Sequence, residues 1–141
     1  MHNMKKFLFI VLLFTNIYCY AAEMTLPIRG VADGDTIKTM LNLPCPLCYV
    51  SIRILGIDTP ESTYLAKCPA ELAKGLEAKL FLTNLVKGHD TMTVRDVKWD
   101  KYGGRIDATV EIDNKNVADL LIAAGLAKPY AGQGPKPNWC S

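Results

Sequence analysis

Short segments rich in β-branched residues dominate this sequence, and one long helical pattern divides them into two groups. The clearest strand is Tyr49–Ile57, where apolar and polar residues alternate. Asp58-Thr59-Pro60 ends it, because proline cannot donate to a β-ladder. We also expect extended structure over Met24–Leu41, with a tight turn at Asp33-Gly34-Asp35, and over Thr91–Val97 and Arg105–Ile112.

Two segments have the period of an α-helix. Pro69–Val86 ends before Gly88 and carries an apolar stripe that we expect to face the rest of the molecule: Ala70, Ala73, Leu76, Leu80 and Leu85. A shorter helix is expected over Asn116–Ala124, with Gly125 as its C-cap. The loop Lys98–Gly104 and the tail Pro129–Ser141, rich in proline and glycine, should be irregular.

The predicted order is therefore β-β-β-α-β-β-α. Five short antiparallel strands cannot bury both faces as an open sheet, so closure into a small barrel is the most economical solution. We predict an α+β fold: a five-stranded OB-fold barrel with helices. A chain of 141 residues fits one such domain, which we place at residues 22–141.

Residues 1–21 have the pattern of a secretory signal peptide. Lys5-Lys6 precede the apolar run Phe7–Phe14, and the small residues Cys19 and Ala21 define a cleavage site after Ala21. The apolar run is shorter than the ~20 residues of a membrane-spanning helix, which argues against an uncleaved anchor. We expect a secreted or periplasmic protein without stable membrane association after cleavage, and a monomer.

A lipoprotein with Cys19 as the acylated residue is a less favoured alternative, because Tyr18 stands where a small residue is needed. Removal of the leader also changes the charge: the net charge of +2 falls to zero once Lys5 and Lys6 are lost. A neutral chain has no overall positive field with which to gather a polyanion. Any capture of nucleic acid must therefore be local.

Four cysteines remain after the leader, Cys45, Cys48, Cys68 and Cys140, and an even number in an exported chain favours disulfides. Of the three possible pairings we favour a local Cys45–Cys48 bridge with a long-range Cys68–Cys140 bridge. A redox CxxC pair and a zinc site are alternatives. The prolines around Cys45 indicate a turn rather than a helix N-terminus, and only one cysteine pair is closely spaced.

Few residues of the expected mature chain can act as nucleophile or base. His89, next to Gly88, is the one histidine left beyond the leader and is interpreted as a loop residue. Neither a G-x-S-x-G nor a Walker motif occurs. Carboxylates at strand ends remain: Asp33 and Asp35 in the first turn, with Asp58 and Glu61 after the third strand. Gathered oxygen ligands of this kind suit Ca²⁺ or Mg²⁺, although Asp-Gly-Asp is also an ordinary turn sequence.

Arg53 stands in the middle of the clearest strand, on the face opposite Val50, Ile52 and Ile54. A guanidinium five residues before Asp58 could bind a phosphate beside a metal ion. An ordinary exposed strand arginine is the equal alternative from the pattern alone.

Four motifs taken in order resemble the staphylococcal nuclease (thermonuclease) family. They are Val31–Thr36 (VADGDT), Ile52–Glu61 (IRILGIDTPE), Asp100–Arg105 (DKYGGR) and Gly125–Ala127 (GLA), and the resemblance runs from about residue 25 to residue 130. It implies an OB-fold enzyme that cleaves DNA and RNA with Ca²⁺, with single-stranded or denatured substrate preferred.

The resemblance also implies roles for individual residues. Asp35 and Asp58 would be carboxylate ligands of Ca²⁺, and Thr59 would offer its carbonyl. Glu61 would be the general base that activates water, while Arg53 and Arg105 would stabilise the phosphate. Substrate would be bound by Lys101 and Tyr102 at the 5′ phosphate and by Tyr130 stacking on a base.

This chain departs from the family pattern in three places, one of which is Tyr130, one position off the family spacing. Gly104 is an extra residue before Arg105, and we expect it to form a β-bulge that restores the direction of the arginine. The alternative is that Arg105 points to the other face and the second phosphate contact is weakened. The Pro-rich tail ending at Trp139-Cys140 replaces a lysine-rich C-terminal helix. We therefore predict a secreted Ca²⁺-dependent nuclease. A catalytically weak or inactive OB-fold module that binds nucleic acid or protein, and a structural protein of the cell envelope, are the alternatives.

Overall fold

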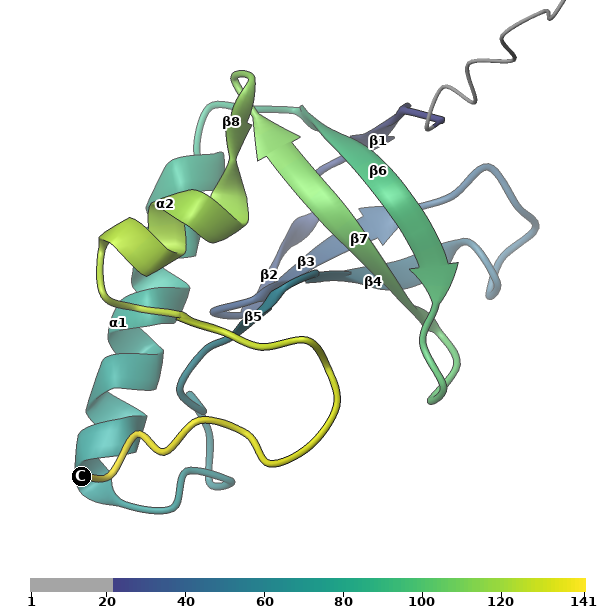
Figure 1. Cartoon of the computed structure of the whole chain (residues 1–141). Coiled ribbons are helices and arrows are strands. Elements are labelled where there is room, and N and C mark those ends of the chain that lie inside the picture. The colour runs from purple at the N-terminus through teal and green to yellow at the C-terminus, as the bar shows by residue number, and fades with distance from the viewer. Residues whose placement is uncertain (1–21) are drawn as a thin grey trace, which may run out of the picture.

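The computed structural model describes residues 22–141, so the expected signal peptide at residues 1–21 lies outside the described part (Figure 1). Two helices and a set of short strands follow one another along the chain. In order these are β1 (Met24–Pro27), β2 (Gly30–Asp33), β3 (Thr36–Met40), β4 (Tyr49–Ile54), β5 (Ile57–Asp58), α1 (Pro69–Val86), β6 (Thr91–Trp99), β7 (Arg105–Ile112), β8 (Lys115–Asn116), α2 (Val117–Ala123) and β9 (Lys128–Pro129).

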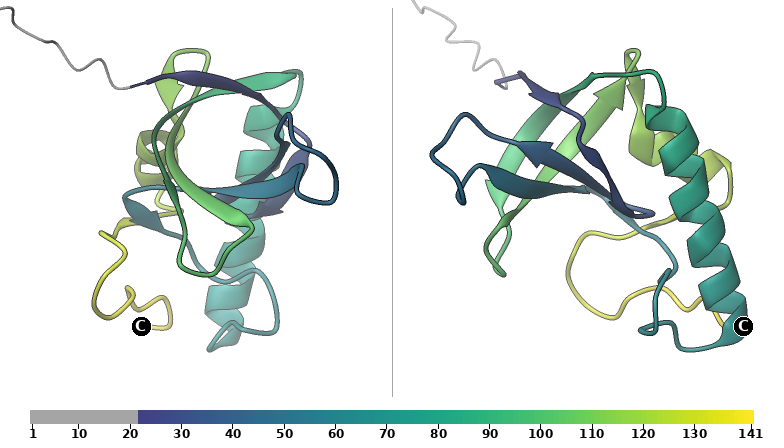
Figure 2. Two further views of the ribbon diagram at one scale, coloured as in Figure 1. Left: turned by 90° about the vertical axis from the view of Figure 1, so that its right-hand side faces the viewer. Right: turned by 180° about the vertical axis from the view of Figure 1, so that it is seen from behind.

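The main sheet runs in the order β1-β6-β7-β4-β3-β2, and β8 pairs with β7. Its two edge strands, β1 and β2, follow each other along the chain and are separated only by Ile28 and Arg29. The Arg29 N–H donates to the Lys38 carbonyl (2.8 Å), while the Ile28 N–H donates to that of Asp90 (2.8 Å). Figure 2 shows the sheet curled so far that this one bent segment forms both edges.

The predicted OB-type α+β fold is thus confirmed, but the expected closure is not: the hydrogen-bonded ladder remains open between β1 and β2. The assumption of purely antiparallel strands was also wrong. β4 and β7 pair in parallel, with Ser51 opposite Arg105 and Arg53 opposite Asp107. A parallel pair requires a long crossover, and the chain through α1 and β6 supplies it.

The core lies between the inner face of the curled sheet and the two helices (Figure 1). β4 and β7 alternate strictly, so every second side chain enters this core. The largest fully buried apolar side chains come from five strands and both helices: Ile37, Ile52, Ile54, Ile57, Val94, Val110, Leu82, Val117 and Leu121. Side chains between them point outward, and the outward face of β4 and β7 carries the functional candidates.

Helix α1 has the predicted bounds but buries a different face from the one expected. Its buried residues are Glu71, Gly75, Ala78, Leu82 and Val86. The stripe of Ala70, Ala73, Leu76 and Leu80 is exposed instead, and Leu85 is half-buried. The helix approaches β2 and the segment after β5 so closely that small residues are needed on that side. The spacing of apolar residues in the sequence does not indicate where such close approach occurs.

The remaining sequence expectations hold with small shifts. The Tyr49–Ile57 strand is broken by a turn at Leu55-Gly56, and β6 extends two residues further than expected, to Trp99. Asn116 caps α2 through its side chain, and Gly125 follows the end of that helix. His89 lies after α1, with Nε2 3.3 Å from Asp113 Oδ2. Within residues 22–141, neither helix is long and apolar enough to cross a membrane.

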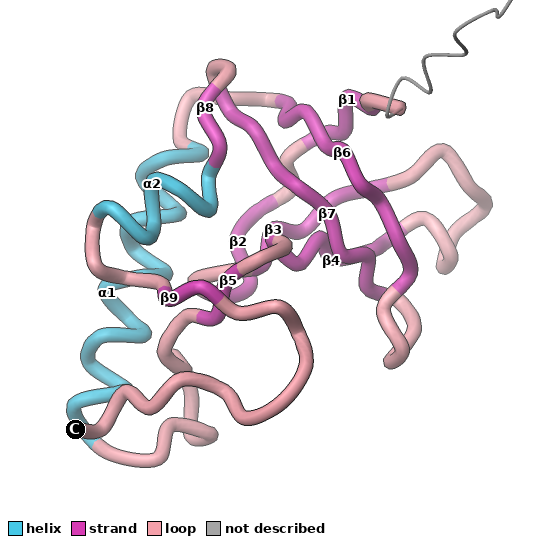
Figure 3. Tube along the Cα trace, in the orientation of Figure 1, coloured by secondary structure: helices cyan, strands magenta, loops and turns pink. Residues whose placement is uncertain are grey.

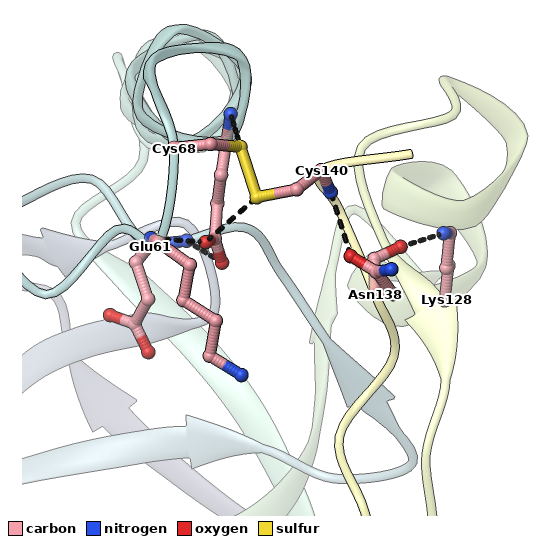
Figure 4. The surroundings of a disulfide bond; sticks show 7 residues. Glu61, Cys68, Lys128, Asn138 and Cys140 are labelled. Atoms are coloured by element: carbon pink, nitrogen blue, oxygen red, sulfur yellow. Dashed lines mark hydrogen bonds between the residues drawn. A yellow bond between two sulfur atoms is a disulfide. The ribbon is translucent and has the colours of Figure 1, made fainter.

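Both favoured disulfides are present, Cys45–Cys48 and Cys68–Cys140. The second joins positions 72 apart in sequence and ties the end of the tail to the residue that caps α1. Figure 3 shows the tail after β9 as loop throughout, and Figure 4 shows the bridge that fixes it beside the start of α1. The expected irregular tail is confirmed, and its end is covalently held.

Removing the long-range bridge should destabilise the protein more than removing the short one, because it closes a far larger loop in the unfolded chain. We expect Cys68→Ser/Cys140→Ser to lower the free energy of unfolding by about 2–4 kcal/mol. Serine at position 68 can still cap α1. Urea denaturation against the matched control Cys45→Ser/Cys48→Ser tests this. An equal loss in both variants would contradict it.

Candidate active site

Two adjacent rows of residues cross the outward face of the sheet where β3, β4 and β7 lie side by side. One row is Lys38, Ser51 and Arg105, and the next is Thr36, Arg53 and Asp107. Arg53 and Arg105 therefore occupy neighbouring positions on one face. The regular alternation of β4 and β7 places them there, since the residues between them are buried in the core.

The carboxylates meet this face from two chain segments. Asp35 lies in the turn between β2 and β3, and Asp58 ends β5; both are buried, as is Thr59. Arg53 Nη2 lies 3.8 Å from Asp35 Oδ2 and donates to the Ile57 carbonyl (3.3 Å). Arg53 thus lies beside Asp35 and is bonded to the residue before Asp58, so it is not a freely exposed strand residue.

Asp35 is a buried charge surrounded by other acids. Burial raises its pKa above the usual range, and Asp33 and Asp58 raise it further, while Arg53 and the Thr36 hydroxyl oppose the shift. The ionised form of Asp35 is therefore destabilised, because Arg53 and Thr36 do not fully offset the effect of burial and of the neighbouring acids. A cation placed beside Asp35 and Asp58 would relieve that cost.

These residues fit a hard divalent cation such as Ca²⁺. Asp35 and Asp58 would supply carboxylate oxygens and Thr59 a carbonyl, with water completing the shell. Within residues 22–141 no cluster of three or more His, Cys, Asp or Glu side chains is arranged to hold a metal. An ion here would therefore depend on two carboxylates together with backbone and water oxygens, which calcium accepts.

Glu61 follows Pro60 on the segment between β5 and α1, and buried Glu71 holds that segment. Glu71 Oε1 accepts from the Glu61 N–H (3.4 Å) and Oε2 accepts from the Lys67 N–H (2.7 Å). The Ser62 hydroxyl donates to Asp33 Oδ1 (2.5 Å) and fixes the same segment to the first turn. The backbone of the predicted general base is therefore anchored from both sides.

Gly75 lets α1 approach this segment. A Cβ at position 75 would lie 2.2 Å from the Glu61 carbonyl oxygen and 2.8 Å from that of Pro60. Both neighbours are backbone atoms, so no side-chain rotation could make room. The placement of Glu61 depends on the missing side chain at this one helix position.

The tail adds contacts that the sequence did not predict. Lys136 Nζ lies 3.4 Å from Asp58 Oδ1 and 3.4 Å from Glu61 Oε1. The Trp139 indole N–H donates to Asp58 Oδ2 (3.2 Å). Burial lowers the pKa of Lys136, but Asp58 and Glu61 outweigh it and the pKa is raised, so the ammonium stays charged. Both oxygens of Asp58 thus face donors from the tail.

Arg105 starts β7 at the end of the turn that follows β6. Its guanidinium is paired with Asp100, with Nε 2.5 Å from Oδ2. Partial burial raises the pKa of Asp100, but hydrogen bonds from Arg105 and from the Tyr102 N–H lower it overall. The predicted second arginine therefore lies on the same face as Arg53 and already has a carboxylate partner.

The extra glycine is accommodated in the turn, and the expected bulge at Gly104 was wrong. Gly103 and Gly104 have φ of 68° and 62°, a region that favours glycine, and the Asp100 N–H closes the turn onto the Arg105 carbonyl (3.0 Å). The irregularity of register lies instead in β6, between Arg95 and Lys98. Turn and partner strand together absorb the insertion.

The substrate candidates line one cleft of about 470 Å³ on this face. Its walls are formed by Arg53, Lys98, Trp99, Asp100, Lys101, Tyr102, Arg105, Asp107, Tyr130, Gly132 and Lys136. Tyr102 is 73% exposed, with Lys101 Nζ 5.0 Å from its ring centre. The Tyr130 hydroxyl donates to the Gly134 carbonyl (2.9 Å), so this ring is held by a later residue of the tail. Cations and aromatic rings in one cleft suit a phosphate with a base attached.

Comparison with known proteins agrees with this geometry. The family described as staphylococcal nuclease homologue matches residues 51–138, more than half of the chain. The chain belongs to the staphylococcal nuclease family. By that membership it is a hydrolase of the nuclease class, and the resemblance stated from the motifs is confirmed.

Curated relatives carry matching names. A probable endonuclease of Schizosaccharomyces pombe is 34% identical over 90 residues, which cover 59% of this chain and 37% of that protein. Uncharacterized endonucleases of Escherichia coli O157:H7 and of Escherichia coli are 28% identical over 134 residues, 95% of this chain and 79% of each relative. The chain thus spans little more than a third of the fungal relative and most of the bacterial ones.

Sequence reasoning missed Glu71, Lys136 and Trp139. Glu71 was the acidic residue in the first turn of a predicted helix, where a solvent-exposed capping role is the ordinary interpretation. Lys136 and Trp139 lie in an irregular tail without periodicity. The one sequence feature that could have placed them near the site was Cys140, because its expected bridge to Cys68 holds the end of the tail close to Glu61.

Gly75→Ala should displace the Glu61 segment. An alanine at an ordinary helix position gains about 0.5–1 kcal/mol over glycine, but here the added carbon meets backbone, and overpacking costs about 1–3 kcal/mol. We expect a lower melting temperature together with lower nuclease activity. Lys74→Ala, at an exposed neighbouring position, is the control. A stabilised, fully active Gly75→Ala protein would refute this packing.

Asp35→Asn should stabilise the metal-free protein. The folded state holds the Asp35 proton more tightly than the unfolded chain, so stability is lost as pH rises from the unfolded pKa, about 3.9, through the folded one. Thermal melting in EDTA should show a gain of a few degrees at pH 7 and a smaller one at pH 4. The exposed Asp90→Asn serves as control. A gain in melting temperature that does not increase with pH would show that burying ionised Asp35 does not destabilise the protein.

Proposed function

We propose that this protein is a secreted, Ca²⁺-dependent nuclease that hydrolyses phosphodiester bonds of DNA and RNA. The observation that carries the proposal is the gathering of cations and acids at one cleft. Arg53, Arg105 and Lys136 line it, with Arg53 beside Asp35 and Lys136 beside Asp58 and Glu61. The family match covers Arg53, Asp58, Glu61 and Arg105, and the order of these residues in the sequence agrees with the resemblance stated from the motifs. Family membership supports phosphodiester chemistry, and the choice of calcium rests on the family resemblance and on the oxygen ligands that Asp35, Asp58 and Thr59 offer.

The side chains would divide the work as follows. Arg53 and Arg105 bind the scissile phosphate and stabilise the negative charge that grows in the transition state. Glu61 accepts a proton from the attacking water. Asp35, Asp58 and Thr59 would hold Ca²⁺, which supplies Lewis-acid polarisation of the phosphate oxygens. Lys101 and Tyr102 bind the 5′ phosphate, and Tyr130 packs against a base.

Substrate capture is local in this proposal. Basic and acidic residues balance once the leader is removed, so long-range attraction of a polyanion is weak. The cleft concentrates positive charge in one place, since five of the residues that line it are Arg or Lys. Exposed Trp99 and Tyr102 beside these cations favour single-stranded or denatured nucleic acid, whose bases are free to stack.

Glu61→Gln should lower the rate of cleavage of denatured DNA and of RNA by about 10²–10⁴-fold, because it removes the general base. EDTA should abolish activity of the wild type, and added Ca²⁺ should restore it. Glu77→Gln, an exposed glutamate on α1, is the matched control and should be fully active. Unchanged activity in Glu61→Gln or in EDTA, or an inactive wild type in Ca²⁺, would refute the proposed mechanism.

Secretion or periplasmic location is proposed from the leader and supported by the two disulfides of the described domain, which suit an oxidising compartment. The exported protein should begin at Ala22. N-terminal sequencing of material recovered outside the cytoplasm tests this. An uncleaved start at Met1 would refute it.

A further inference from the structure

The C-terminal tail is irregular, yet its path is fixed at several points. At its start the Tyr130 N–H donates to the Gly56 carbonyl (2.9 Å). Near its end Lys128 Nζ donates to the Asn138 carbonyl (2.7 Å) and lies 4.3 Å from the centre of the Trp139 ring. The Cys68–Cys140 bridge completes the attachment, with Glu61 on the adjoining segment in Figure 4. The tail is therefore a strap across the active site.

The strap brings one cation to the reacting centre. Lys136 contacts Asp58, a proposed metal ligand, and Glu61, the proposed general base. Its side chain is 52% exposed and lines the same cleft as Arg53 and Arg105. An ammonium on a flexible four-carbon stem can change partners within this cleft without movement of the strap.

We propose that Lys136 is a further substrate-binding residue, which binds the phosphate of the nucleic acid beside the catalytic centre and is held there by the disulfide-fixed tail. This inference rests on the proposed nuclease function. Two like charges a few ångströms apart repel, so a divalent ion on Asp58 disfavours the contact between Lys136 and that carboxylate. The phosphodiester brings a negative charge into the cleft at the same time, and the ammonium transfers to it.

The test compares steady-state cleavage of a single-stranded oligonucleotide by the wild type, Lys136→Met and Lys136→Arg. We expect Lys136→Met to raise KM about tenfold with kcat changed less than about threefold, and Lys136→Arg to restore most of the loss. Lys115→Met, in the β7–β8 hairpin at the opposite end of the molecule, should equal the wild type. An unchanged KM in Lys136→Met, with an active wild type, overturns the inference and leaves the nuclease function intact.

Salt dependence separates a phosphate contact from a structural role. Each phosphate contact with a single strand contributes about 0.7 to the slope of log affinity against log salt. Lys136→Met should therefore show a slope lower by about this amount, measured as oligonucleotide affinity in Ca²⁺ on the slow-cleaving Glu61→Gln background. An unchanged slope overturns the inference.

Calcium binding measured by calorimetry provides a readout independent of activity. If Lys136 only competes with the metal, Lys136→Met will bind Ca²⁺ more tightly and cleave with a higher kcat/KM, and the inference is wrong. A raised KM together with comparable or tighter Ca²⁺ binding supports it. If neither protein binds Ca²⁺ and the wild type does not cleave, the proposed function fails, and this inference fails with it.

A double-mutant cycle tests the strap. Cys68→Ser/Cys140→Ser, assayed well below its melting temperature, should raise KM as Lys136→Met does, because the released tail no longer holds the ammonium in the cleft. Adding Lys136→Met to it should change KM little further. Full additivity of the two effects would show that the bridge does not position Lys136.

Discussion

The approach of α1 to the backbone of Pro60 and Glu61 is the contact on which the site depends. The helix can lie there only because position 75 carries no side chain. Buried Glu71, one turn earlier, then accepts hydrogen bonds from the Glu61 and Lys67 N–H groups and so ties this segment to the helix. Packing of one helix thus fixes the segment that carries the proposed general base. A rigid scaffold around such a group favours catalysis, since small displacements cost rate.

The second organising principle is charge. Asp35, Asp58 and Glu61 gather negative charge in a partly buried place. Arg53 pairs with Asp35 and Lys136 pairs with Asp58 and Glu61, while Arg105 lines the same cleft and pairs with Asp100. Arg53 is fixed by strand alternation, Arg105 by the turn after β6, and Lys136 by the strap. The cleft is thereby strongly charged although the net charge of the whole chain is only +2, and the Cys68–Cys140 disulfide holds the end of the tail that brings Lys136 to it.

Much of the site could be predicted because its residues lie at strand ends and on one strand face, where local sequence rules hold. The helix bounds, the irregular tail and the disulfide pairing followed from proline, glycine and cysteine positions. The buried face of α1 could not be predicted, because close backbone approach selects Gly75 and Ala78 over exposed leucines. The expected bulge at Gly104 failed for a similar reason: the insertion was absorbed by a turn and by the neighbouring strand.

By itself, the sequence determined the order of the longer strands and the two helices, most of the acidic and basic residues of the site, and the family, because these depend on local pattern and on motifs. The tertiary structure alone decided the rest. It set β4 parallel to β7, which places Arg53 and Arg105 in neighbouring rows. It also brought the tail across the site, so that Lys136 and Trp139 meet Asp58 from 78 and 81 positions away in sequence. Contacts at that separation leave no periodic signal, since only the folded backbone brings them together.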